Sequence, residues 1–189
     1  MGLVRRAGVT LFHDNKEREL SNELSSLSIT DNISGAIDSV EFVLKNDKNR
    51  LLQVENELCI GERISLQFWT HNWNTGDEGI KTYNLGVYYI DERNFDNATG
   101  RFKALSIPLG DSQDEVNTKT WGEISLESLN KEFSKKYGIT SFFSSKNNPL
   151  LKDIKQENET DLSFLGKIAD QEGINFKINV DKLIMFDIE

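Results

Sequence analysis

The residue types that most often carry chemistry are scarce in this chain and lie far apart in the sequence. The only histidines are His13 and His71, and the only cysteine is Cys59. A zinc site needs three or four protein ligands, and a Cys–His nucleophile needs both members within hydrogen-bond reach. These residues leave one alternative open, a site for a single metal ion that uses both histidines and a carboxylate. We predict no catalytic residue, no cofactor and no metal ion.

Acidic residues are too numerous for any pair to stand out as a general acid and base. The chain carries 31 Asp and Glu against 22 Lys and Arg, and adjacent acids such as Asp91–Glu92 and Asp114–Glu115 lie in polar stretches. Solvated charges on loops are a simpler explanation of these pairs than catalysis is. The glycines do not have the spacing of a phosphate-binding loop. The sequence therefore predicts a protein that is not an enzyme.

Composition and charge describe a chain that folds and that does not bind nucleic acid stably. Hydrophobic residues at 37% can bury a core, and the net charge of -9 opposes contact with a phosphate backbone. No apolar run approaches the ~20 residues that cross a bilayer, so we expect no membrane partner. The lone Cys59 lies between Leu58 and Ile60, which favours a buried, reduced thiol.

Aromatic residues offer one binding hypothesis from a different class. Trp69 and Trp73, together with Tyr83, Tyr88 and Tyr89, could stack on a sugar ring, as in a carbohydrate-binding or cell-wall-binding module. Packing in a core or an interface is the competing explanation, and we favour it.

The N-terminal part of the chain alternates apolar and polar residues in short runs separated by turn residues. This period of two predicts about six strands in an antiparallel sheet that curls into a barrel or sandwich. We expect strands from Leu3 to Phe12, from Leu27, from Ser39 to Leu44, across Ile64 to Phe68, from Leu85 to Ile90, and from Phe102 to Ile107, where Pro108 stops the last. Turns or loops are expected at 13–16, 31–35, 46–56, 71–81 and 96–100.

The last third of the chain, Asn117 to Phe186, predicts a helix, a strand, a loop, a second helix and a hairpin. Ser125 is a candidate N-cap, and Gly138 a candidate helix end. The second helix begins near Thr160 and ends at Gly173. Leu109 to Lys119 is expected to be a polar link, and Trp121 a packing anchor. The fold class is thus α+β and rich in β-structure, with domains at 1–112 and 113–189.

The final strand carries apolar side chains on both faces. Leu183-Ile184-Met185-Phe186 has no polar alternation, which is typical of a strand covered on two sides. We expect it to end at an unfinished edge, covered by another layer or by further chain.

Several segments, in this order, resemble the late-control D and tail-baseplate hub proteins of phages. Asn84–Asp91 resembles the family's "LGxYxID" strand, and Thr118–Leu126 its "KTW…TL" helix entry. Gln156–Leu165 is similar to its "QxxETDLxFL" segment, Ile168–Gly173 to its "LAxxxG", and Lys182–Phe186 to its next strand. The resemblance spans nearly the whole chain and is weakest before Ile29.

The resemblance implies a structural hub that joins a tail tube to a central spike in a phage or phage-like contractile tail. It implies a tube-like β-barrel in the N-terminal domain, a homo-oligomer (a trimer in the family), and tail-tube and spike proteins as partners. It also implies assembly in the bacterial cytoplasm and residence in the particle's tail. Family members are usually about twice as long, with a second tube-like barrel, so we expect this chain to correspond to the N-terminal half.

Overall fold

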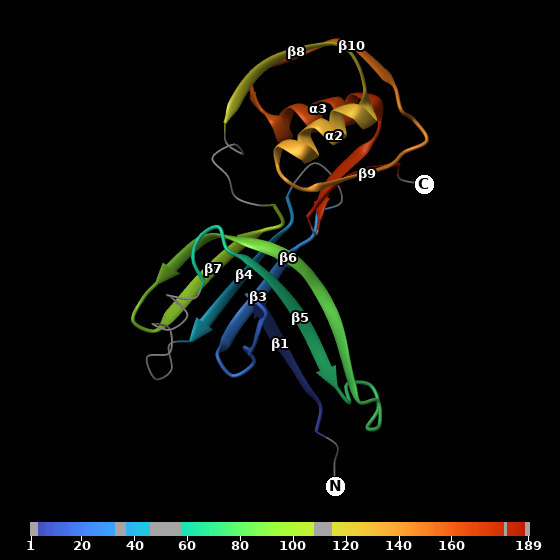
Figure 1. The fold of residues 1–189 in the computed structure, drawn as a ribbon. Coiled ribbons are helices and arrows are strands. Elements are labelled where there is room, and N and C mark those ends of the chain that lie inside the picture. Colours follow the sequence, from blue (N-terminus) through green and yellow to red (C-terminus); the bar gives the residue numbers. More distant parts are fainter. Residues whose placement is uncertain (1–3, 33–36, 46–57, 108–114, 180, 188–189) are drawn as a thin grey trace. The chain divides into compact units, whose positions relative to one another are not determined.

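The computed structural model describes residues 4–32, 37–45, 58–107, 115–179 and 181–187 (Figure 1). They form two compact units, one of residues 1–30 and 39–105, the other of residues 31–38 and 106–189. The expected domain boundary between 112 and 113, the loop at 46–56 and the strand end at Pro108 lie outside the described residues. Segment 31–38, inserted between two strands of the first unit, belongs to the second unit.

The described residues of the first unit form a seven-stranded antiparallel sheet, where the period of two predicted an antiparallel sheet of about six strands. Its strands are β1 (Arg6–His13), β2 (Lys16–Glu19), β3 (Leu24–Thr30), β4 (Ser39–Lys45), β5 (Arg63–His71), β6 (Ile80–Phe95) and β7 (Thr99–Leu105). They are ordered β2-β1-β5-β6-β7-β4-β3. Two strands differ from the prediction. Strand β2 was not predicted; it follows β1 directly because Asp14 and Asn15, both with positive φ, form a two-residue turn. Strand β6 is longer at both ends than the strand expected from Leu85 to Ile90.

Pairing among the described strands leaves this sheet open, with β2 and β3 at its two ends. Residues 20–23 connect those ends directly: the Leu20 N–H donates to the Val9 carbonyl, and the Lys45 N–H donates to the Glu23 carbonyl. A four-residue link of this kind draws the two ends of the sheet together at one point, so the sheet curls without a ladder that closes it.

The core of the first unit lies on the inner face of this curled sheet. The alternating residues Val40, Phe42 and Leu44 are almost fully buried, and so are Ile64 and Leu66. Phe42 stacks on Phe102 of the neighbouring strand with ring centroids 4.9 Å apart. The strands predicted from Ser39 to Leu44 and across Ile64 to Phe68 are therefore confirmed, with alternate residues facing the core.

The described residues of the second unit form two helices and two small sheets. Its elements are β8 (Val116–Ser125), α2 (Leu126–Lys136), β9 (Thr140–Ser144), β10 (Leu150–Thr160), α3 (Asp161–Glu172), β11 (Asn175–Asn179) and β12 (Lys182–Phe186). Both helix predictions are confirmed at their ends. The Ser125 hydroxyl accepts from the Ser128 N–H and the Thr160 hydroxyl from the Ser163 N–H, while Gly138 and Gly173 adopt positive φ after the helices.

A long two-stranded ribbon of β8 and β10 was missed in the sequence. Residues 116–119, expected in a polar link, start β8, and β10 occupies the stretch between the expected loop and the second helix, where no strand was predicted. Neither strand alternates apolar and polar residues, because only a few side chains face inward, among them Trp121, Leu151 and Gln156. A hydrophobic period cannot reveal a strand that buries so little.

The terminal strand β12 lies inside a sheet, which corrects the expected unfinished edge. It pairs antiparallel with β11 and parallel with β9. Leu183 and Met185 are fully buried, while Ile184 and Phe186 on the other face are half-buried. The apolar character on both faces therefore reflects a central strand with one covered and one partly covered face.

Asp31, Ile37 and Asp38 contact β11 within the second unit. Ile37 forms a parallel bridge with Ile178, and Lys177 makes ion pairs with Asp31 and, at 3.1 Å, with Asp38. The Ser106 hydroxyl donates to the Ile178 carbonyl at 2.9 Å. Two chain segments distant in sequence thus join the same strand.

Gly8 offers a test of the packing behind β1. A Cβ atom there would meet the Ser21 hydroxyl and, at 2.5 Å, the Trp69 ring, whereas a Cβ at Gly122 would meet nothing within 4 Å. We expect Gly8→Ala to lower the free energy of unfolding by about 1–3 kcal/mol through overpacking. Gly122→Ala, the control, should change it by about 0.5 kcal/mol or less. Urea denaturation measures both, and equal stability of the two variants would contradict the packing described.

Candidate functional site

The predicted chemistry-bearing residues do not gather into one site. The Nε2 atom of His13 lies 2.9 Å from the Glu62 carboxylate, while His71 pairs with Arg6 at the other end of β1. Seven residues of strand, about 23 Å, separate these positions along β1. The Cys59 Sγ lies 3.8 Å from the Arg93 guanidinium. In the described ranges, no group of three or more His, Cys, Asp or Glu side chains could hold a metal ion.

The acid pairs named in the sequence behave as surface charges where they are described. Lys103 lies 3.0 Å from Glu92 and 3.8 Å from Asp91, and all three side chains are at least partly exposed. Asp114 lies outside the described residues. None of the described helices is long and apolar enough to cross a bilayer.

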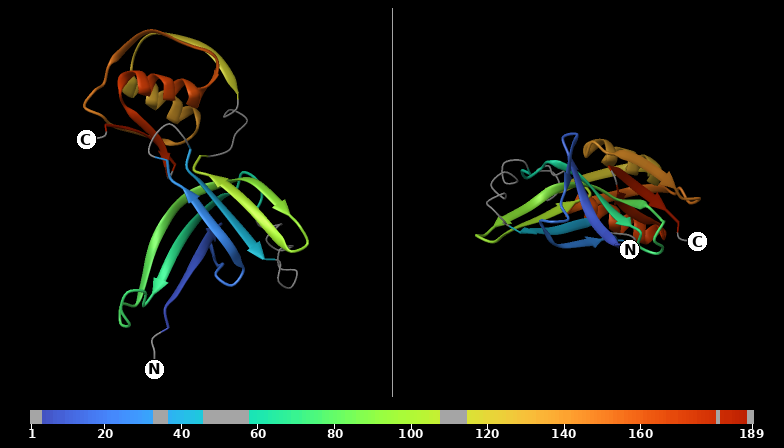
Figure 2. Two further views of the ribbon diagram at one scale, coloured as in Figure 1. Left: turned by 180° about the vertical axis from the view of Figure 1, so that it is seen from behind. Right: turned by 90° about the horizontal axis from the view of Figure 1, so that it is seen from below.

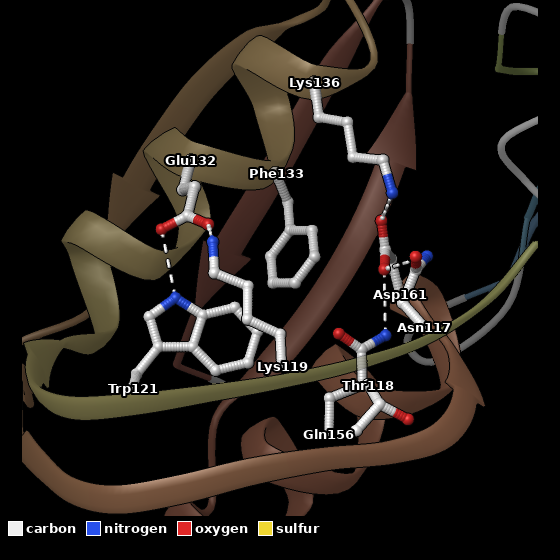
Figure 3. Close-up of a pocket in the computed structure, with 9 residues that line it drawn as sticks. All are labelled: Asn117, Thr118, Lys119, Trp121, Glu132, Phe133, Lys136, Gln156 and Asp161. Atoms are coloured by element: carbon white, nitrogen blue, oxygen red, sulfur yellow. Dashed lines mark hydrogen bonds and ion pairs between the residues drawn. The ribbon is translucent and has the colours of Figure 1, made fainter.

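A cavity of about 240 Å³ lies in the second unit between the β8–β10 ribbon and the two helices (Figure 3). Strands β8 and β10 and helices α2 and α3 all contribute to its wall. The lining residues are Asn117, Thr118, Lys119, Trp121, Glu132, Phe133, Lys136, Gln156 and Asp161. This cavity lies wholly within the second unit.

The carboxylate of Asp161 forms the polar side of this cavity. Its side chain is only 2% exposed, and it sits at the first position of α3, where the helix dipole favours an acid. Lys136 Nζ lies 2.6 Å away, and the carboxylate accepts hydrogen bonds from Gln156 Nε2 at 2.8 Å and Asn117 Nδ2 at 3.3 Å (Figure 3). A buried charge is stable only with partners of this kind.

The Tyr137 hydroxyl completes the shell around Asp161. It donates to the carboxylate at 3.1 Å. Burial first, and then the negative charge of Asp161, raise the pKa of the Tyr137 hydroxyl well above its usual range. The hydroxyl therefore stays protonated near neutral pH, as a donor to the carboxylate and not as a base.

Aromatic rings form the apolar side of the cavity. Trp121 stacks on Phe164 with centroids 5.2 Å apart, and Phe133 packs against both rings. The Trp121 Nε1–H donates to the Glu132 carboxylate at 3.1 Å, and Lys119 Nζ lies 4.8 Å above the indole ring (Figure 3). Trp121 is thus the packing anchor that the sequence predicted.

These contacts give a physical account of the motif residues. Trp121 comes from the "KTW" stretch, while Gln156, Asp161 and Phe164 come from the "QxxETDLxFL" stretch. Folding brings them together as one ring stack and one charged cluster. Each acid that lines the cavity accepts from a donor, so these contacts join the ribbon to the helices.

The aromatic residues of the carbohydrate hypothesis do not share one surface. Trp69 packs over Gly8, and its Nε1–H donates to Glu19 at 2.9 Å. Tyr88 is buried. Only Trp73 and Tyr83, 50% and 49% exposed, line a hollow with Phe68, Thr70 and Asn74 at the tip of the β5–β6 hairpin. That hollow is largely apolar, and sequence reasoning missed the contributions of Phe68 and Thr70.

The fold matches several solved structures over most of this chain. A tail protein from Neisseria meningitidis matches at a TM-score of 0.67 and 16% identity, covering 95% of this chain and 50% of its own. The chain has the fold of phage tail proteins. A 43 kDa tail protein of prophage MuSo2 from Shewanella oneidensis matches at a TM-score of 0.62 and 14% identity, covering 95% of this chain and 54% of its own.

A component of a type VI secretion system has the same fold. This Escherichia coli protein, described as structurally similar to the T4 tail proteins gp27 and gp5, matches at a TM-score of 0.52 and 11% identity, covering 86% of this chain and 49% of its own. The chain therefore spans about half the length of the structures it matches. No protein-family profile matches the sequence. No curated protein matches it either.

Replacing Asp161 tests whether its carboxylate holds the second unit together. In Asp161→Asn, Lys136 loses its partner and the buried donors lose a charged acceptor. We expect the free energy of unfolding to fall by about 3 kcal/mol. Asp170→Asn on the exposed side of the same helix is the matched control and should cost about 0.5 kcal/mol or less. Urea denaturation that ranks the two variants alike would contradict this role.

The Tyr137 hydroxyl predicts a pH dependence of stability in the alkaline range. Its pKa is raised in the folded state, so above the ordinary value near 10 the unfolded chain releases this proton while the folded chain retains it. The free energy of unfolding should therefore fall as pH rises from about 9 to about 11, and Tyr137→Phe should reduce that fall. Urea denaturation at a series of pH values measures the difference, and parallel curves would refute it.

Proposed function

We propose that this protein is a structural component of a phage or phage-like contractile tail, where it acts as a baseplate hub that joins the tail tube to the central spike. The observation that carries the proposal is the match to tail proteins along 95% of the chain. The ordered sequence motifs support it independently, because their residues form the Asp161 and Trp121 clusters. A tail location for the mature protein follows from the same proposal.

The proposed role is mechanical and requires no catalysis. A hub must hold its shape while it contacts several neighbours, and the described residues form two packed units with acids that are paired by donors. Its proposed partners are further copies of itself, tail-tube subunits and spike or baseplate proteins. A net charge of -9 suits a protein beside which DNA passes without binding.

The test is whether the protein is built into tails. A tagged copy expressed with the intact tail gene cluster should co-purify with sedimenting tail particles, and its deletion should yield particles whose tubes lack spikes. Asp161→Asn, which weakens the second unit, should reduce incorporation, whereas Asp170→Asn should not. A tagged protein that is soluble and abundant but never sediments with tails would overturn the proposal. Turnover of peptidoglycan by the purified chain would contradict the non-catalytic role.

A carbohydrate-binding function receives no support of similar strength. It needs a platform of rings with polar groups around it, and only Trp73 and Tyr83 of the candidate rings face the same hollow. The amide of Asn74 at its rim is already bonded to Glu78.

A further inference from the structure

Strand β6 carries an edge without a strand partner among the described residues. It pairs with β5 from Ile80 to Tyr89 but with β7 only from Tyr89 to Phe95. The β5–β6 hairpin therefore extends past the end of β7, as Figure 1 and the left view of Figure 2 show. An unpaired row of N–H and C=O groups is a template for another strand.

The usable part of this edge is the five-residue stretch Ile80–Asn84. Beyond it a bulge interrupts the ladder, where the Gly86 N–H donates to the Asn84 side chain and the Tyr88 hydroxyl donates to the Leu85 carbonyl. These local bonds block the edge at the bulge. The stretch before it has no such cap in the part of the chain that the structure describes.

An apolar hollow lies beside this edge, on the core-facing side of the hairpin. Tyr83 pairs across the ladder with Phe68, whose ring packs against the core. With Trp73 they line a hollow of about 350 Å³. Recognition by strand addition needs both features, a backbone edge for hydrogen bonds and a hollow for alternate side chains.

The opposite end of the sheet, β3, has the complementary features. Its outer edge has no described strand partner, and its regular part, Ser26–Thr30, is five residues long and contains no charge. Leu27 and Ile29 share the core-facing side with Phe42 and Val40, and Ile29 is still 39% exposed. By contrast, all four residues of the other end strand, β2, are charged, which protects that edge.

We propose that a second copy of this chain adds its β3 to the free edge of β6 and places Leu27 and Ile29 against the hollow of Phe68, Trp73 and Tyr83. The two stretches match in length, and the apolar row of β3 continues the apolar side of the hairpin. The hydroxyl row of Ser26, Ser28 and Thr30 then adjoins Thr82 and Asn84. The one charge on the receiving edge, Lys81, is already paired with Glu78.

This contact uses different surfaces on the two copies, so each copy keeps one donor strand and one acceptor edge free for the next. A head-to-tail interface of this kind forms a ring or an open chain, not a two-fold dimer. A second copy is favoured over another occupant because the chain itself carries a strand with the required length, exposure and lack of charge.

The experiment uses two variants that each block one side. Ser28→Lys puts a charge on the donor strand, and Tyr83→Ser removes the ring from the acceptor hollow. Sedimentation velocity over a concentration series should show that the wild-type chain self-associates. The affinity of self-association should be lower by about tenfold or more in each variant. A mixture of the two should form a one-to-one pair and nothing larger, because one intact donor meets one intact acceptor.

Glu17→Lys on β2 is the matched control, since it changes the charge of the other end strand and should leave self-association unchanged. Circular dichroism and thermal unfolding establish that each variant is folded. A wild-type chain that stays monomeric at every concentration overturns the proposal, and so does a mixture that fails to pair. Growth of the mixture beyond the pair would point to a different interface and also overturns it.

A cross-linking measurement keeps the proposal testable if a blocking variant misfolds. In a Cys59→Ser background, one copy carries Ile29→Cys and the other Tyr83→Cys. A short bismaleimide should link the mixed copies far faster than it links either variant alone, and equal rates would refute the contact. The tail function is tested separately: a chain that sediments with tails but shows no β3–β6 contact would contradict this inference alone.

Discussion

The buried carboxylate of Asp161 is the interaction on which the second unit depends. It joins the start of α3 to the end of α2 through Lys136 and Tyr137, to β10 through Gln156 and to β8 through Asn117. A single negative charge held by four donors fixes four segments, because losing any donor leaves charge or polar atoms in a poorly solvated place. The Trp121–Phe164 stack secures the same ribbon and helix from the apolar side. Together they let a strand pair with little hydrophobic surface stay on the helices.

A different feature characterises the first unit, namely the difference in charge between the two end strands of its sheet. The short link at 20–23 draws the two ends of the sheet together, yet one end strand is fully charged and the other carries no charge. Charged edges resist pairing with other chains, while uncharged ones allow it. An uncharged β3 in a chain with 28% charged residues is therefore consistent with a surface that is buried in an assembly.

Both units belong to a fold that solved tail proteins share. The fold is that of phage tail proteins and of a type VI secretion component, at identities of 11–16%. Segment 31–38 lies between two strands of the first unit in the sequence but belongs to the second unit, where Lys177 makes ion pairs with Asp31 and Asp38.

The sequence by itself determined the elements that bury a periodic face: strands β4 and β5, both helices with their caps, the β11–β12 hairpin and the packing role of Trp121. Local hydrophobic period and capping chemistry suffice for these, because each is set by residues a few positions apart. The sequence also contained the residues of the Asp161 cluster, but their meeting depends on contacts between positions up to 44 residues apart. Only the tertiary structure decided that polar stretches pair as the β8–β10 ribbon and that β12 is a central strand with β9 as a parallel neighbour. It also decided that Trp69 packs over Gly8 while Trp73 lines a hollow with Tyr83. Those outcomes depend on which partners cover each strand, and a single strand's composition does not specify its partners.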